Sequence, residues 1–61
     1  MNKSPELLLK ELGMHIKALQ KSLDKAARKA EGLEIEDVEY LLRGAYIYTK
    51  TALDYIEEKV E

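Results

Sequence analysis

His15 is the only histidine in the chain and the side chain best suited to metal or acid–base chemistry. Glu11 lies one helical turn before it, and Asp54 would lie near Glu11 if two helices pack antiparallel. Carboxylate metal sites in helical bundles use a Glu-x-x-His spacing, which is absent here. A structural zinc site also lacks ligands, because the chain has no cysteine. We therefore expect no metal and no cofactor, with His15 at the boundary of the hydrophobic core.

The serines and carboxylates show no catalytic arrangement. Ser4 fits the start of a helix, and helix geometry cannot bring Ser22 near His15, so neither hydroxyl has a base within hydrogen-bond reach. Adjacent carboxylates, such as Glu57 and Glu58, fall on exposed faces rather than in a cleft. The three glycines are scattered and form no phosphate-binding loop. We expect a chain that is not an enzyme, with no catalytic residue and no small-molecule substrate.

A row of basic side chains in the first half of the chain could bind nucleic acid. A phosphate backbone could follow such a row along one side of a helix. The net charge of −2 and the presence of only two arginines argue against this function. An alternative is pairing between the two halves, because residues 1–30 hold seven basic and three acidic residues, whereas residues 31–61 hold three and nine. The basic row consists of Lys10, Lys17, Lys21, Lys25 and Arg28.

The elements that position these residues begin with a long helix over about residues 5–31. Ser4 can cap its first N–H groups, and Pro5 fits its first turn. Gly32 is expected to end the helix in a left-handed conformation, which glycine adopts cheaply. Apolar residues alternate steps of three and four, which predicts a helix rather than a strand. They are Leu9, Leu12, Ile16, Leu19, Leu23, Ala26, Ala30 and Leu33.

A second helix is expected over about residues 36–59, after a turn at about residues 32–35. Acidic residues crowd its first turns, where they complement the positive end of the helix dipole. All four tyrosines lie in this helix, and we interpret them as core or interface residues rather than as groups that stack on bases. The apolar stripe has the period of a helix. It comprises Ile35, Val38, Leu41, Leu42, Ala45, Tyr48, Thr49, Ala52, Tyr55 and Ile56, and Tyr46, Leu53 and Val60 widen it on one side.

A turn this short makes the two helices antiparallel neighbours, so that facing residues have numbers that sum to roughly 65–68. Leu12, Ile16 and Leu19 then lie opposite smaller residues of the second helix, as interdigitated packing requires. One neighbour cannot cover the whole apolar stripe of the second helix, and a chain this small usually needs oligomerisation to complete its core. We expect a homodimer that forms a four-helix bundle with coiled-coil-like packing. Its core or interface residues would be Leu9, Leu12, Ile16, Leu19, Leu23, Val38, Leu42, Ala45, Tyr48, Ala52, Tyr55 and Ile56.

The sequence thus predicts an all-α fold in which residues 1–61 form one helical hairpin. We expect a cytoplasmic protein without a membrane partner, because no aliphatic run is long enough to span a bilayer and Met1 to Pro5 lack the apolar segment of a signal peptide. The prominence of lysine and glutamate is typical of proteins from hyperthermophiles. The expected function is a non-enzymatic, oligomeric interaction or structural module that binds its own copies or another protein. The alternative is a nucleic-acid-binding regulator that acts through the basic row.

Overall fold

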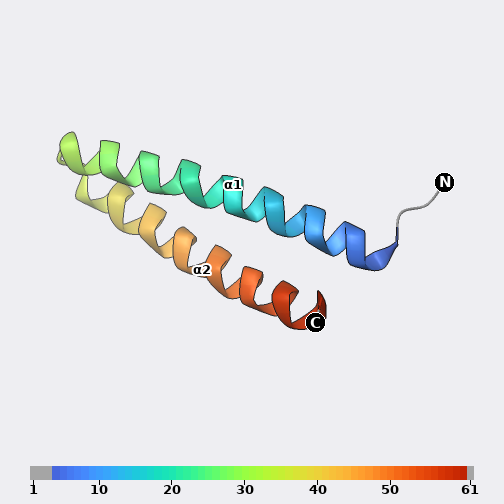
Figure 1. The fold of residues 1–61 in the computed structure, drawn as a ribbon. Coiled ribbons are helices and arrows are strands. Elements are labelled where there is room, and N and C mark those ends of the chain that lie inside the picture. Colours follow the sequence, from blue (N-terminus) through green and yellow to red (C-terminus); the bar gives the residue numbers. More distant parts are fainter. Residues whose placement is uncertain (1–3, 61) are drawn as a thin grey trace.

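Two α-helices joined by a tight turn make up residues 4–60, the part of the chain that this computed structural model describes. Helix α1 spans Pro5–Gly32 and helix α2 spans Glu36–Val60. They pack against each other in antiparallel orientation, with the turn at one end of a hairpin 48 × 21 × 12 Å in extent (Figure 1). The all-helical hairpin predicted from the sequence is confirmed. The expectation about the first residues, Met1 to Lys3, lies outside the described range.

Ser4 begins α1 in the way that the sequence predicts. Its backbone is extended, and its hydroxyl oxygen accepts a hydrogen bond of 3.2 Å from the Leu7 N–H. Its carbonyl oxygen accepts a second hydrogen bond of 3.0 Å from the Leu8 N–H. Pro5 occupies the first turn, where its missing N–H leaves no bond unmade. These contacts define where the first helix starts.

The turn differs from the sequence prediction in the residue that takes the left-handed conformation. That residue is Glu34, with φ of 60°, whereas Gly32 is the last residue of α1 and does not have a positive φ. The Glu34 N–H donates to the Glu31 carbonyl at 3.0 Å, and the Ile35 N–H donates to the Ala30 carbonyl at 2.9 Å. These two bonds form a Schellman motif, which needs its left-handed residue directly before Ile35. The expectation for Gly32 was therefore wrong by two positions.

The fully buried positions of the seam between the helices are small residues. Gly13, Ala27 and Ala30 are the buried residues of α1, and no large side chain within residues 4–59 is fully buried. A Cβ built on Gly13 would lie 3.6 Å from Leu53 Cδ1 and 4.0 Å from a methyl group of Ile56. At Gly13, the side chains of Leu53 and Ile56 pack toward the α1 backbone because glycine has no side chain of its own.

The stripe that α1 turns toward α2 is shifted by one residue from the predicted heptad pattern. Gly13, Gln20 and Ala27 are at least partly buried, whereas Leu12, Leu19 and Ala26 beside them are exposed. The remaining members of the predicted stripe between Leu9 and Ala30 are also at least partly buried. The hairpin contact therefore runs along one edge of the heptad stripe and leaves its other edge exposed to solvent.

Replacing Glu34 by glycine should stabilise the hairpin by about 1 kcal/mol, because a residue with a Cβ pays roughly 1–2 kcal/mol for the left-handed conformation. Thermal unfolding followed by circular dichroism measures this change. Gly32→Ala is the control and should not lower the unfolding midpoint, because the backbone of Gly32 is helical and a Cβ there meets nothing within 4 Å. A lower unfolding midpoint for Glu34→Gly would contradict the assigned turn.

Replacing Gly13 by alanine should also stabilise the protein, by up to about 1 kcal/mol, because alanine has the higher helix propensity. The added methyl group would make ordinary van der Waals contact with Leu53 and Ile56. Gly13→Leu should instead cost about 1–3 kcal/mol through overpacking. Chemical denaturation of both variants tests the close approach. Equal effects of alanine and leucine would mean that the helices do not meet at Gly13.

Candidate interaction surface

The residues that could have supported chemistry are spread over the exposed surface. His15 and Ser22 are exposed on α1, Asp54 is exposed on α2, and the Ser4 hydroxyl is engaged at the start of α1. Within residues 4–60, no group of three or more His, Asp or Glu side chains is placed to hold a metal ion. The remaining features with functional potential are surfaces that span both helices.

One side of the hairpin gathers charged residues, and we call it the charged face. Lys10 and Lys17 line a groove there with Glu57. Asp24 and Arg43 line a second groove together with Tyr46. The charged face comprises Lys10, Lys17, Lys21, Asp24 and Arg28 on α1 and Glu39, Arg43, Lys50 and Glu57 on α2.

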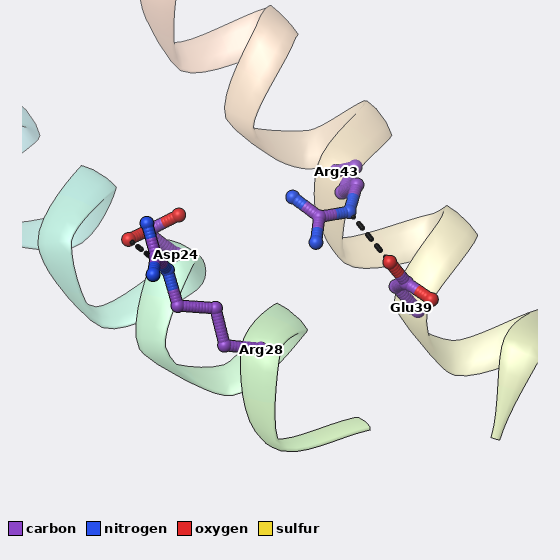
Figure 2. A network of polar contacts seen from close by, with 4 residues as sticks. All are labelled: Asp24, Arg28, Glu39 and Arg43. Atoms are coloured by element: carbon purple, nitrogen blue, oxygen red, sulfur yellow. Dashed lines mark hydrogen bonds and ion pairs between the residues drawn. The ribbon is translucent and has the colours of Figure 1, made fainter. Parts of the chain in front are cut away.

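Two ion pairs on the charged face stabilise individual helices (Figure 2). Arg28 Nε lies 3.1 Å from Asp24 Oδ2 on α1, and Arg43 Nε lies 2.8 Å from Glu39 Oε2 on α2. Each pair joins residues four apart in one helix, where such exposed pairs contribute about 0.3–0.5 kcal/mol. These two pairs therefore support the helices rather than join α1 to α2.

Arg43 is also influenced by acidic groups of the neighbouring helix. Its hydrogen bond to Glu39 is the largest of the effects that raise the pKa of Arg43 above its ordinary value, and the negative charges of Glu39, Glu31 and Asp24 act in the same direction. Glu31 and Asp24 belong to α1. The attraction between the two helices at this point is thus a longer-range effect that adds to the local ion pair.

The opposite side of the hairpin carries exposed apolar side chains from both helices, and we call it the apolar face. Successive helical residues are about 100° apart, so Leu12 and Leu19 lie beside the seam on the side away from Lys10 and Lys17. Both leucines are 48% exposed. By the same geometry, no charged residue of α2 between Val38 and Tyr55 falls on this side. The apolar face comprises Leu8, Leu12, Leu19 and Ala26 on α1 and Val38, Leu41, Ala45, Tyr48, Ala52 and Tyr55 on α2.

The core or interface residues expected from the sequence divide into two groups in the hairpin. One group is partly buried: Leu9, Ile16, Leu23, Leu42, Ala45 and Ile56. The other group is exposed: Leu12, Leu19, Val38, Tyr48, Ala52 and Tyr55. Except for Ala45, which lies at the boundary, the first group belongs to the seam and the second to the apolar face. The two groups together form the continuous stripes that the sequence pattern detected.

The residues of the basic row are all exposed, and they lie on one side of α1. Arg28 is paired with Asp24, and Glu57 lies across the groove from Lys10 and Lys17. A carboxylate therefore lies beside the basic row at each of its two ends. Lys21, in the middle of the row, lines a groove with Asp24 and so also has a carboxylate beside it.

Sequence reasoning missed several residues that shape these surfaces. Gly13 and Ala27 were overlooked because an apolar pattern search favours the leucines beside them. Gly44 and Ile47, on the outer side of α2, were not assigned to any surface. Gly13 lies seven residues before Gln20 and Ala27 seven residues after it. The small size of Gly13 and Ala27 at this spacing was the available signal for the seam.

None of the helices within residues 4–60 is both long and apolar enough to cross a bilayer. Comparison with known proteins finds no family model, no curated protein and no solved structure that matches this chain.

Proposed function

We propose that this chain is a non-enzymatic helical module that associates with a second copy of itself through the apolar face and forms a four-helix bundle. The observation that carries the proposal is the gathering of exposed apolar side chains on one side of the hairpin, whereas both ion pairs lie on the other side. A monomer would keep the apolar side in water. A bundle would bury that side and leave the charged face of each copy available to solvent or to another protein.

The exposed area of the hairpin supports self-association. The chain has a mass of 7.0 kDa and an accessible surface of 5332 Å². A compact monomer of this mass is expected to expose about 4,000 Å². The excess is roughly 1,300 Å², and a standard protein–protein interface buries about 800 Å² per partner. One interface of ordinary size would therefore reduce the accessible surface area of the chain to nearly that of a compact protein.

The direction of the apolar stripes gives a second argument. The centre of each stripe lies about 40–50° around its helix from the seam, taking 100° per residue. Both stripes deviate toward the apolar face. In an isolated hairpin each stripe should point straight at the other helix, whereas in a four-helix bundle it points between two neighbours, near 45° from each. The residue pattern thus fits two neighbours per helix, and the hairpin supplies one.

Leu19→Glu should dissociate the dimer, because it would bury an unpaired carboxylate in the interface. We expect the dimer to weaken by at least about 100-fold. Sedimentation equilibrium measures the effect as an assembly mass smaller than that of the wild-type protein. Met14→Glu is the matched control, since Met14 is an exposed apolar residue of α1 that lies outside the apolar face. A wild-type protein that stays folded as a monomer at micromolar concentration would refute the proposal.

The second candidate function is binding of nucleic acid by the basic row, and the observation that favours it is the exposure of all five cations on one side of α1. If this function holds, Lys17→Glu combined with Lys21→Glu should abolish a low-salt gel shift with RNA or DNA. Lys29→Glu combined with Lys59→Glu changes the net charge equally at exposed lysines outside the basic row and the charged face, and it should keep the shift. Absence of any shift by the wild-type protein at low salt would eliminate this candidate, because phosphate binding is strongest there.

A further inference from the structure

A second apolar feature lies on the outer side of α2, beyond the edge of the apolar face. Tyr40, Leu41, Ile47 and Tyr48 line an open groove of about 710 Å³, with Gly44 between them. The four side chains are 79%, 68%, 64% and 80% exposed, so they are among the least covered apolar groups of the hairpin. The groove shares Leu41 and Tyr48 with the apolar face.

The apolar face alone does not account for this groove. Tyr40 and Ile47 lie more than about 90° around α2 from the centre of the apolar face, taking 100° per residue. A copy that packs on the apolar face would leave both of them in solvent.

Gly44 has no packing role within the hairpin. A Cβ built there meets nothing within 4 Å, and its φ is not positive. Glycine in the middle of a helix is unfavourable relative to alanine, so the chain's own fold offers no reason for it. A small residue between large apolar ones is what the close approach of another helix requires.

The residues around Gly44 are arranged symmetrically along the helix. Leu41 and Ile47 stand three positions to either side of it, and Tyr40 and Tyr48 stand four positions to either side. A two-fold axis at Gly44 would pair this surface of α2 with the same surface of an antiparallel copy. Leu41 shares one side of the groove with Tyr48, and Tyr40 shares the other with Ile47. Each tyrosine of one copy would contact an aliphatic residue of the other.

The charge of the groove is compatible with burial. Arg43 is the charged residue among those that line it, and its Nε is 2.8 Å from the Glu39 carboxylate. A helix that covers the groove would thus meet an ion pair rather than an isolated cation. A partner helix with an unpaired acidic or basic stripe would form no favourable contact with the apolar walls of the groove. The helix α2 of another copy presents the same apolar side chains and would pack against them.

We propose that α2 of another copy docks antiparallel in this groove and crosses at Gly44, as an interface separate from the apolar face. This inference rests on the proposed function in one respect, namely that the chain associates with itself. It adds that each chain has two self-complementary surfaces. The assembly then contains more than two chains.

Single-cysteine variants test the crossing point directly, since the chain has no cysteine of its own. A disulfide forms only where two Cα atoms lie about 4.4–6.8 Å apart. Under mild oxidation, Gly44→Cys should give covalent dimers in most of the protein. Ala18→Cys, on the exposed back of α1, is the control and should form few. Equal cross-linking of the two variants would overturn the proposed crossing.

Sedimentation equilibrium separates the two interfaces. The wild-type assembly should exceed twice the chain mass of 7.0 kDa, and Gly44→Glu should reduce it to a helical dimer. The variant should fold, because the added side chain meets no atom of its own hairpin within 4 Å at the Cβ. A wild-type assembly that stops at two chains would overturn the second interface and leave the proposed function standing. A folded wild-type monomer would overturn both.

Discussion

Two helices touch each other along a single line, and this geometric limit governs the whole molecule. A side chain on either helix can be enclosed only if it lies on that line, and here the line passes through Gly13, Ala27 and Ala30. Small residues allow the helices to approach closely, but they enclose little apolar surface of their own. Several larger side chains, among them Leu12, Leu19 and Tyr48, lie beside the line and stay exposed. The separation into an apolar and a charged side follows from this arrangement.

Most of the fold could be predicted from the sequence because its signals are local. The capping side chain of Ser4, the position of Pro5 and the heptad spacing each act within one or two turns of helix. The shortness of the segment between the helices then leaves an antiparallel hairpin as the one way to pack them. The residues buried in the seam were harder to predict. The heptad pattern gives the mean direction of the apolar side of a helix, but it does not give the direction of the one neighbouring helix in the hairpin.

The two differences from expectation have physical causes. Gly13 and Gln20 face α2 instead of Leu12 and Leu19 because the hairpin contact occupies only one edge of the apolar stripe. Glu34 rather than Gly32 takes the left-handed conformation because the hydrogen bond from Ile35 to Ala30 fixes where the chain reverses. Glycine is preferred at such a position, but the preference is small beside the geometry of the turn. The outer groove of α2 was not foreseen, since Gly44 gives no periodic signal.

The Schellman turn has a consequence for how quickly the chain becomes available for assembly. The most completely buried residues, Ala27 and Ala30, lie within a few positions of that turn, so the first contacts to form close only a short loop. Helical proteins with such local contacts fold in microseconds to milliseconds. Encounters between chains at cellular concentrations are slower and depend on how many chains are present. For the self-association that we propose, collision rather than folding would limit the rate, so assembly would depend on the abundance of the chain.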